Sequence, residues 1–178
     1  MIIGVLGDPG TGKTLIMSAF AHFLRMYDSL PLASNYPLRF SRRVSTLEDV
    51  ARINNGIFCF DEAWVDLESR NSAKGNQQIT QWVLQMRKKS VVMFYTVQDL
   101  DQIDKRVRRN TNLFIVCHRL VNPRRHLFVF GDRNGRPLAK LMMDPPHRFY
   151  SLYDTYAVVQ PLQFSGIKGR QINTHRIS

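Results

Sequence analysis

Residues 7–14, with the sequence Gly7-Asp8-Pro9-Gly10-Thr11-Gly12-Lys13-Thr14, constrain the fold of this 178-residue chain more than any other segment. They follow a short apolar run (residues 2–6) and precede a helical pattern that extends to about Tyr27. The eight residues satisfy G-x-x-x-x-G-K-[ST] in full, which in a strand–turn–helix setting predicts a phosphate-binding loop, or P-loop. The glycines permit positive φ, so that backbone N–H groups can surround an anion at the positive end of the following helix.

All eight loop residues are therefore expected to bind nucleotide, and two of them have specific predicted roles. The Lys13 ammonium is expected to contact the β- and γ-phosphates, and the Thr14 hydroxyl is expected to be a ligand of Mg²⁺. The expected cofactors are accordingly ATP and Mg²⁺.

The second half of the predicted site is Asp61-Glu62, directly after the apolar run 56–60. A carboxylate at a strand end can hold Mg²⁺ through its water shell, which is the role predicted for Asp61. Glu62 can polarise the attacking water as a general base. This pair favours hydrolysis coupled to work over the chemistry of a small-molecule kinase.

Gln98 closes the next apolar run, which begins at Val91. A polar side chain at this place is expected to contact the γ-phosphate or the attacking water, so Gln98 joins the candidate catalytic residues. The alternative is that Gln98 only terminates its strand.

Apolar runs of strand length alternate with helical patterns, which predicts an α/β fold with a mostly parallel sheet flanked by helices. Ligands bind at the carboxyl ends of strands in such sheets, where the P-loop, Asp61 and Gln98 would all lie. The runs 126–130 and 137–143, joined by Gly131-Asp132-Arg133-Asn134-Gly135, predict a β-hairpin.

The helical patterns give two finer predictions. The helix after the P-loop is expected to bury one apolar face, formed by Leu15, Ala19, Phe23 and Met26. A short polar helix is predicted over residues 101–109.

The length is that of one domain, and 44% hydrophobic residues suffice for one core. We expect a single ATPase domain over residues 1–164 and a basic tail over residues 165–178. The longest apolar runs have the length of strands, so no membrane-spanning helix and no secretion signal is expected. Cys59 and Cys117 lie inside apolar runs and are predicted to be buried, reduced thiols.

The formal net charge of +11 is unevenly distributed. Residues 106–178 carry 13 of the 25 Lys and Arg residues but only 3 of the 14 acidic ones. This excess indicates a polyanion partner, although a generally basic, solvated surface would look the same. On charge alone, the candidate DNA contacts are Arg106, Arg108, Arg109, Arg124, Arg125, Lys168 and Arg170.

The order of the motifs resembles that of a known superfamily. The P-loop is followed by Asn35 after the second strand, Asp61-Glu62-Ala63, Arg87-Lys88 before the strand that ends in Gln98, Ile103-Asp104 with Arg106, and Tyr153-Asp154-Thr155. This order resembles the FtsK–HerA superfamily of DNA-pumping ATPases, especially the small genome-packaging ATPases of membrane-containing icosahedral viruses. It is also similar to the zonula-occludens-toxin-like assembly ATPases of filamentous phages.

The resemblance implies a RecA-like core that acts as a homo-oligomeric ring, with a hexamer expected, and that uses ATP to move double-stranded DNA into a capsid. It also implies an arginine finger donated to the neighbouring subunit. Arg87 lies nearest the position of the finger in that family, and Arg70 is the alternative. A capsid or membrane-associated viral protein is a further expected partner, and the expected location is the cytoplasm of an infected host cell or the virion.

Three other functions stay open at this point. The chain could drive extrusion of a filamentous phage, although ATPases of the toxin-like family carry a membrane segment that is not evident here. It could be a nucleotide or metabolite kinase, which would need a lid with catalytic arginines. It could be a switch that binds nucleotide without pumping, which would not need Glu62.

Overall fold

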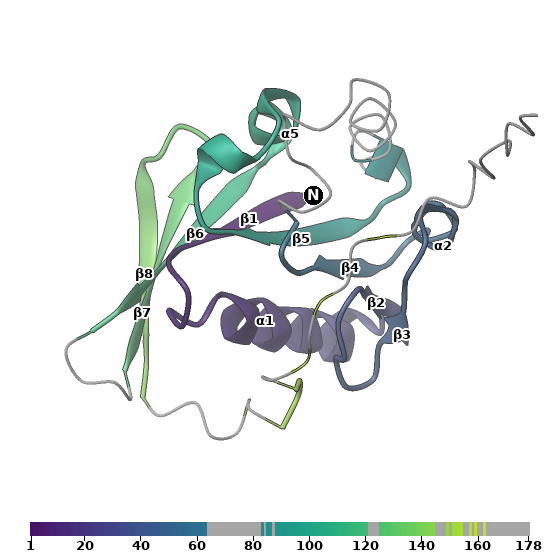
Figure 1. Ribbon diagram of the computed structural model, residues 1–178, viewed down its shortest axis with the longest axis horizontal. Helices are drawn as coiled ribbons and strands as arrows, with labels where there is room; N and C mark the ends of the chain where they lie inside the picture. Colours follow the sequence, from purple (N-terminus) through teal and green to yellow (C-terminus); the bar gives the residue numbers. More distant parts are fainter. Residues whose placement is uncertain are drawn as a thin grey trace, which may run out of the picture.

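A computed structural model describes residues 1–63, 83, 85, 86, 88–120, 125–144, 149, 151–154, 157, 159 and 162. The described elements (Figure 1) are β1 (Ile2–Leu6), α1 (Lys13–Asp28), β2 (Leu32–Ser34), β3 (Arg42–Arg43), α2 (Leu47–Ala51), β4 (Ile57–Phe60), β5 (Val92–Val97), the 3₁₀ helix η1 (Leu100–Gln102), α5 (Lys105–Asn110), β6 (Leu113–Arg119), β7 (His126–Asp132) and β8 (Pro137–Met143). Among these residues no helix is both long enough and apolar enough to cross a membrane.

The eight described strands form one sheet in the order β3-β2-β4-β5-β1-β6-β7-β8. Every pair from β3 to β6 is parallel, whereas β7 and β8 add an antiparallel hairpin at one side of the sheet. The predicted mostly parallel α/β sheet and the predicted hairpin are both confirmed. Because β5 lies between β1 and β4, its carboxyl end lies between the end of β1, where the P-loop begins, and the end of β4, which Asp61 follows.

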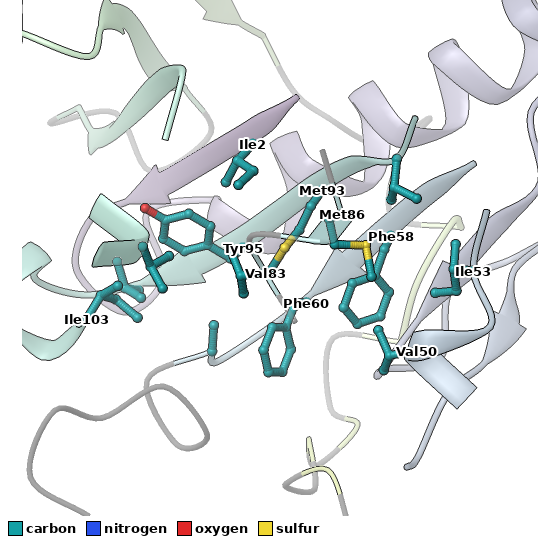
Figure 2. Packing of buried hydrophobic residues seen from close by; sticks show 14 of the residues in the cluster. Ile2, Val50, Ile53, Phe58, Phe60, Val83, Met86, Met93, Tyr95 and Ile103 are labelled. Atoms are coloured by element: carbon teal, nitrogen blue, oxygen red, sulfur yellow. The ribbon is translucent and has the colours of Figure 1, made fainter. Parts of the chain in front are cut away.

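The strands β2, β4, β5 and β1 are buried on both faces because helical segments cover each side of the sheet there, whereas β3 and β8 are largely exposed. On one face, Ile3, Val5 and Phe94 pack with the buried side of α1. The other face forms a second cluster around β4 and β5, shown in Figure 2; its labelled members are Ile2, Val50, Ile53, Phe58, Phe60, Val83, Met86, Met93, Tyr95 and Ile103. Successive residues of a strand alternate between the two clusters, as the pleat requires.

The prediction for the buried face of α1 is only half right. Leu15 and Ala19 are buried, but Phe23 is 63% and Met26 is 68% exposed. At 1.5 Å per residue α1 is about 24 Å long, whereas the five-residue strand β1 spans about 16 Å. The second half of α1 nevertheless reaches the core, because Ala21 is fully buried and Leu24 packs against the core cluster. The side of the helix that packs there is the side of Ala21 and Leu24, and Phe23 and Met26 lie outside it.

The helix predicted over residues 101–109 is wrong as a single element. The structure divides this region into η1 and α5, and Ile103 at the junction has an extended backbone. Asp99 and Asp104 each cap one of the two short helices, with side-chain oxygens that accept the N–H groups of Asp101 and Arg106 respectively. Two capping signals close together start two helices rather than one.

Candidate nucleotide-binding site

The P-loop joins β1 to α1 and has the backbone conformation that its glycines permit. The φ angles of Gly7, Gly10 and Gly12 are 143°, 75° and 95°, all in the region that L-residues avoid. A Cβ atom on Gly7 would lie 2.6 Å from the carbonyl oxygen of Cys117 in β6. At this position glycine is required by both the backbone angle and the packing.

The carbonyl groups of the loop are held by hydrogen-bond donors. Lys13 Nζ donates to the carbonyl oxygens of Gly7 (2.8 Å) and Asp8 (3.1 Å). The Thr11 hydroxyl also donates to the Asp8 carbonyl (2.7 Å), and Ile16 N–H donates to the Gly12 carbonyl (2.9 Å). A buried lysine whose hydrogen bonds go to carbonyl oxygens is well placed to exchange them for phosphate oxygens.

Asp61 and Glu62 follow β4, and Asn35 at the end of β2 holds their backbone. The Asn35 side chain accepts the Asp61 N–H at 2.7 Å and donates to the Asp61 carbonyl at 2.9 Å. The amide side chain thus continues the β2–β4 pairing by one step, as a backbone amide would. It places the two carboxylates directly beyond the carboxyl edge of the sheet.

Thr96 in β5 holds the same turn from the other side. Its hydroxyl donates to Asp61 Oδ1 at 2.6 Å and accepts the Glu62 N–H at 2.8 Å, and its carbonyl accepts the Ala63 N–H at 3.0 Å. These bonds support Glu62 at a φ of 52°, an uncommon value for a residue with a side chain. Such a backbone persists only where its surroundings determine it, and here two strands do so.

Asp61 faces the first turn of α1, where the Thr14 hydroxyl lies 3.0 Å from Oδ2 and 3.2 Å from Oδ1. Asp61 is 6% exposed. Burial raises its pKa, while the hydrogen bonds from Thr96 and Thr14 act in the opposite direction. One hydroxyl and one carboxylate at this separation are hard oxygen donors that fit Mg²⁺, and a cation there would favour the ionised form of Asp61.

A cavity of about 350 Å³ opens beside these groups. Its wall includes P-loop residues, both carboxylates, Tyr36, and residues from three later parts of the chain: His126, Tyr153-Asp154, and Ala157 with Val159. Leu152 packs in the core cluster on the α1 side of the sheet, and Leu162 packs in the cluster on the opposite side. The described residues between them therefore pass the carboxyl edge of the sheet, where the cavity lies.

The structure brings together most of the predicted nucleotide site. Lys13, Thr14, Asp61 and Glu62 all line the cavity. Gln98 is exposed, one position beyond the end of β5. The two candidate arginine fingers, Arg87 and Arg70, lie outside the described residues.

The candidate DNA contacts are distributed over several regions. Arg106 and Arg109 are exposed on α5, while Arg108 forms a 2.7 Å ion pair with Asp101. Arg125 forms a 2.6 Å ion pair with Asp144. Three further candidates lie outside the described residues: Arg124, Lys168 and Arg170.

Sequence reasoning missed three residues at the site: Thr96, His126 and Arg119. Thr96 contacts both carboxylate residues, and His126 Nδ1 lies 2.9 Å from the Thr11 carbonyl oxygen. Arg119 ends β6, and its Nη1 lies 3.9 Å from the place that a Cβ on Gly10 would take. Only Thr96 had a sequence signal, as a hydroxyl in an otherwise apolar strand.

Comparison with known families gives one match. The sequence profile of the ATPase family associated with various cellular activities (AAA) matches residues 3–118, which include the P-loop, Asp61-Glu62 and β1 to β6. No curated protein sequence matches the chain.

Solved structures with the same fold come from several kinds of protein. The N-terminal domain of zonular occludens toxin from Neisseria meningitidis has a TM-score of 0.62 and 16% identity, covering 86% of this chain and 98% of that one. B204, the DNA-packaging ATPase from Sulfolobus Turreted Icosahedral Virus, has a TM-score of 0.55 and 15% identity, covering 81% and 97%. The flagellar accessory protein FlaH from Methanocaldococcus jannaschii has a TM-score of 0.52 and 9% identity, covering 80% and 84%. At these identities the likeness concerns the fold, and one fold can carry several functions.

Proposed function

The chain belongs to the ATPase family associated with various cellular activities (AAA), and from that premise we propose that it is a motor that uses ATP hydrolysis to move double-stranded DNA. The cellular role we propose is packaging of a viral genome into a capsid. The fold shared with a DNA-packaging ATPase supports this proposal. The expected location is the cytoplasm of an infected host cell or the virion.

The observation that carries the DNA part of the proposal is helix α5. Four of its six residues are Lys or Arg, and Lys105, Arg106 and Arg109 are exposed. The helix packs on the sheet through Val107, which is fully buried, so its cations face outward from a fixed position. A cluster of arginines on one rigid element suits phosphate contacts, which give affinity without sequence preference.

In the proposed reaction each residue of the site has its own role. Lys13 Nζ would exchange the Gly7 and Asp8 carbonyls for phosphate oxygens. Thr14 and Asp61 would hold Mg²⁺, which neutralises phosphate charge when it is bound. The Glu62 carboxylate would take a proton from the attacking water. Asn35 holds the Asp61 backbone and Thr96 holds the Glu62 N–H, so these bonds fix the turn that carries the carboxylate.

A ring, with a hexamer expected, would allow one subunit to complete the site of the next. Charge develops on the transferring phosphoryl group, and a positioned arginine contributes roughly 10³–10⁵-fold in rate. Arg87 is our candidate for this residue, with Arg70 as the alternative.

The test measures ATP turnover alone, with double-stranded DNA and with single-stranded DNA. A packaging motor should be stimulated by double-stranded DNA. Its affinity for that DNA should fall by about 0.9 logarithmic units per contacted phosphate for each tenfold rise in salt concentration. Replacing Arg106 and Arg109 by Gln should lower the ratio of stimulated to basal turnover. The exposed Arg133→Gln in the β7–β8 turn is the matched control and should keep that ratio.

The second candidate function is a motor that extrudes a filamentous phage, because the toxin domain shares the fold over 86% of this chain. Stimulation by single-stranded DNA in preference to duplex would favour it. Turnover that no DNA changes would contradict both motors and favour a kinase or a switch.

A further inference from the structure

His126 is a polar residue with an unusual place in this molecule. It begins β7, is only 6% exposed, and lines the nucleotide cavity. Its ring stacks on that of the fully buried Phe128, with the centroids 6.0 Å apart and the planes 14° apart. The packing therefore fixes the plane of the imidazole, while its Nδ1 reaches the P-loop.

The contact of Nδ1 determines which ring nitrogen carries hydrogen. Nδ1 lies 2.9 Å from the carbonyl oxygen of Thr11, and a carbonyl oxygen can only accept. Nδ1 is therefore the donor. The carbonyls of Gly7, Asp8 and Gly12 are held by donors from the loop itself or from α1. Among the residues that the structure describes, the Thr11 carbonyl alone is held by a donor from a distant strand.

Fixing the Thr11 carbonyl also fixes the amide of Gly12. The two groups belong to one trans peptide, so the Gly12 N–H points away from the oxygen that His126 holds. Gly12 lines the cavity and is the last glycine before Lys13. A P-loop binds phosphate through such N–H groups, so the direction of this peptide plane decides whether one of them is available.

Packing holds the same peptide from the side. A Cβ added to Gly12 would lie 3.0 Å from His126 Nδ1 and 3.4 Å from Cε1, so the ring lies against the Gly12 backbone. Gly12 has a φ of 95°, a conformation that glycine can leave easily when nothing opposes it. Contact with the imidazole ring opposes such a change in the Gly12 backbone.

We infer that His126 is a positioning residue for nucleotide binding, which orients the Thr11–Gly12 peptide so that the Gly12 N–H can donate to a phosphate of ATP. This inference rests on the proposed role of the P-loop as the phosphate site. The β7–β8 hairpin therefore does more than extend the sheet, because its residue His126 supports the nucleotide site.

Three variants separate the hydrogen bond from the packing. His126→Asn keeps an N–H near the position of Nδ1, His126→Gln places its amide near the position of Nε2, and His126→Phe keeps the ring without a donor. We expect Gln and Phe to raise the Kd for ATP about tenfold, since one hydrogen bond to the loop is lost. Asn should recover at least half of that change on a logarithmic scale. The contact is made before hydrolysis, so KM should rise and kcat should stay within about threefold.

The control is His118→Gln, an exposed histidine in the neighbouring strand β6, which should bind ATP as the unaltered protein does. Melting temperature without nucleotide and the ¹⁵N–¹H signal of Gly12 distinguish a local change from misfolding. Equal Kd values for the Asn, Gln and Phe variants would overturn the inference, as would an unshifted Gly12 signal in His126→Gln. If Lys13→Ala binds ATP as tightly as the unaltered protein, the proposed P-loop site itself fails, which is a separate outcome.

Discussion

The hydroxyl of Thr96 lies 2.6 Å from Asp61 Oδ1 and joins strand β5 to the turn that carries Asp61 and Glu62. The same oxygen accepts the Glu62 N–H, so one atom holds both the side chain of the predicted metal ligand Asp61 and the backbone of the predicted general base Glu62. This position in β5 is fully buried, and water cannot replace the hydroxyl if it is lost.

Thr96→Val should keep the shape of the side chain but leave two buried groups without their partner. We expect the free energy of unfolding to fall by about 1–3 kcal/mol and kcat for ATP to fall with it. Urea unfolding and steady-state turnover measure the two effects. Thr96→Ser is the control because it keeps the hydroxyl, and equal losses in both variants would show that the hydroxyl is not the cause.

Lys13→Ala should abolish ATP turnover while the fold survives. Within the described part of the chain, the lysine makes its two hydrogen bonds to loop carbonyls, so its loss removes a charge from the phosphate site and leaves the strands untouched. Turnover and circular dichroism measure the two expectations. Hydrolysis near the rate of the unaltered protein would contradict the assignment of the loop.

Glu62→Gln should preserve nucleotide binding and slow hydrolysis by about 10²–10⁴-fold, the usual contribution of a general base. Glutamine keeps the length of the side chain and the backbone N–H that Thr96 accepts. A titration with labelled ATP and a single-turnover assay separate binding from chemistry. A parallel loss of affinity and rate would instead make Glu62 a structural or metal-binding residue.

The arginine that completes the site can be located by mixing variants. If Arg87 acts across a subunit interface, Arg87→Ala and Lys13→Ala proteins should recover part of the activity when they co-assemble, since some interfaces pair an intact loop with an intact finger. Arg119 is the matched comparison, because it approaches Gly10 within its own chain. Arg119→Ala should lower activity, and mixing it with Lys13→Ala should restore none.

Recovery with Arg119→Ala would mean that Arg119 serves a neighbour. Absence of recovery with Arg87→Ala, in mixtures shown to co-assemble, would move the finger role to Arg70 or Arg119.

The two cysteines should be inert in the folded protein. Burial raises the pKa of Cys117 to about 12 and raises that of Cys59 as well. At pH 8 both thiols should resist iodoacetamide until urea exposes them, because the thiolate is the reactive form. Raised pKa values also predict that stability is lost as pH rises from about 8.5, the ordinary thiol value, towards about 12 for Cys117. Rapid alkylation of the native protein would contradict this.

The parts of the site that the sequence predicted are those formed by consecutive residues. The P-loop and Asp61-Glu62 each follow an apolar strand, so local spacing was sufficient to identify them. Thr96 and His126 act through contacts that depend on the order of the strands, and no local pattern encodes that order. A single histidine before an apolar strand looks the same whether it faces solvent or a loop.

The same reasoning explains the errors in the helices. Periodicity gave the length of α1, but Phe23 and Met26 are exposed because the second half of the helix packs on the core through Ala21 and Leu24 instead. Which side of a helix meets the sheet depends on the whole fold. Similarly, the pattern over residues 101–109 was helical throughout, yet the cap at Asp104 started a new helix.

The separation of 115 positions between Thr11 and His126 has a consequence for the time course of synthesis. The phosphate loop leaves the ribosome early, and the histidine that braces it leaves after β1 to β6 have all been made. During most of translation the loop is thus present without its brace, and the growing chain should hold ATP more weakly than the finished one. Nucleotide retention by stalled ribosome–nascent chain complexes should increase once β7 has emerged.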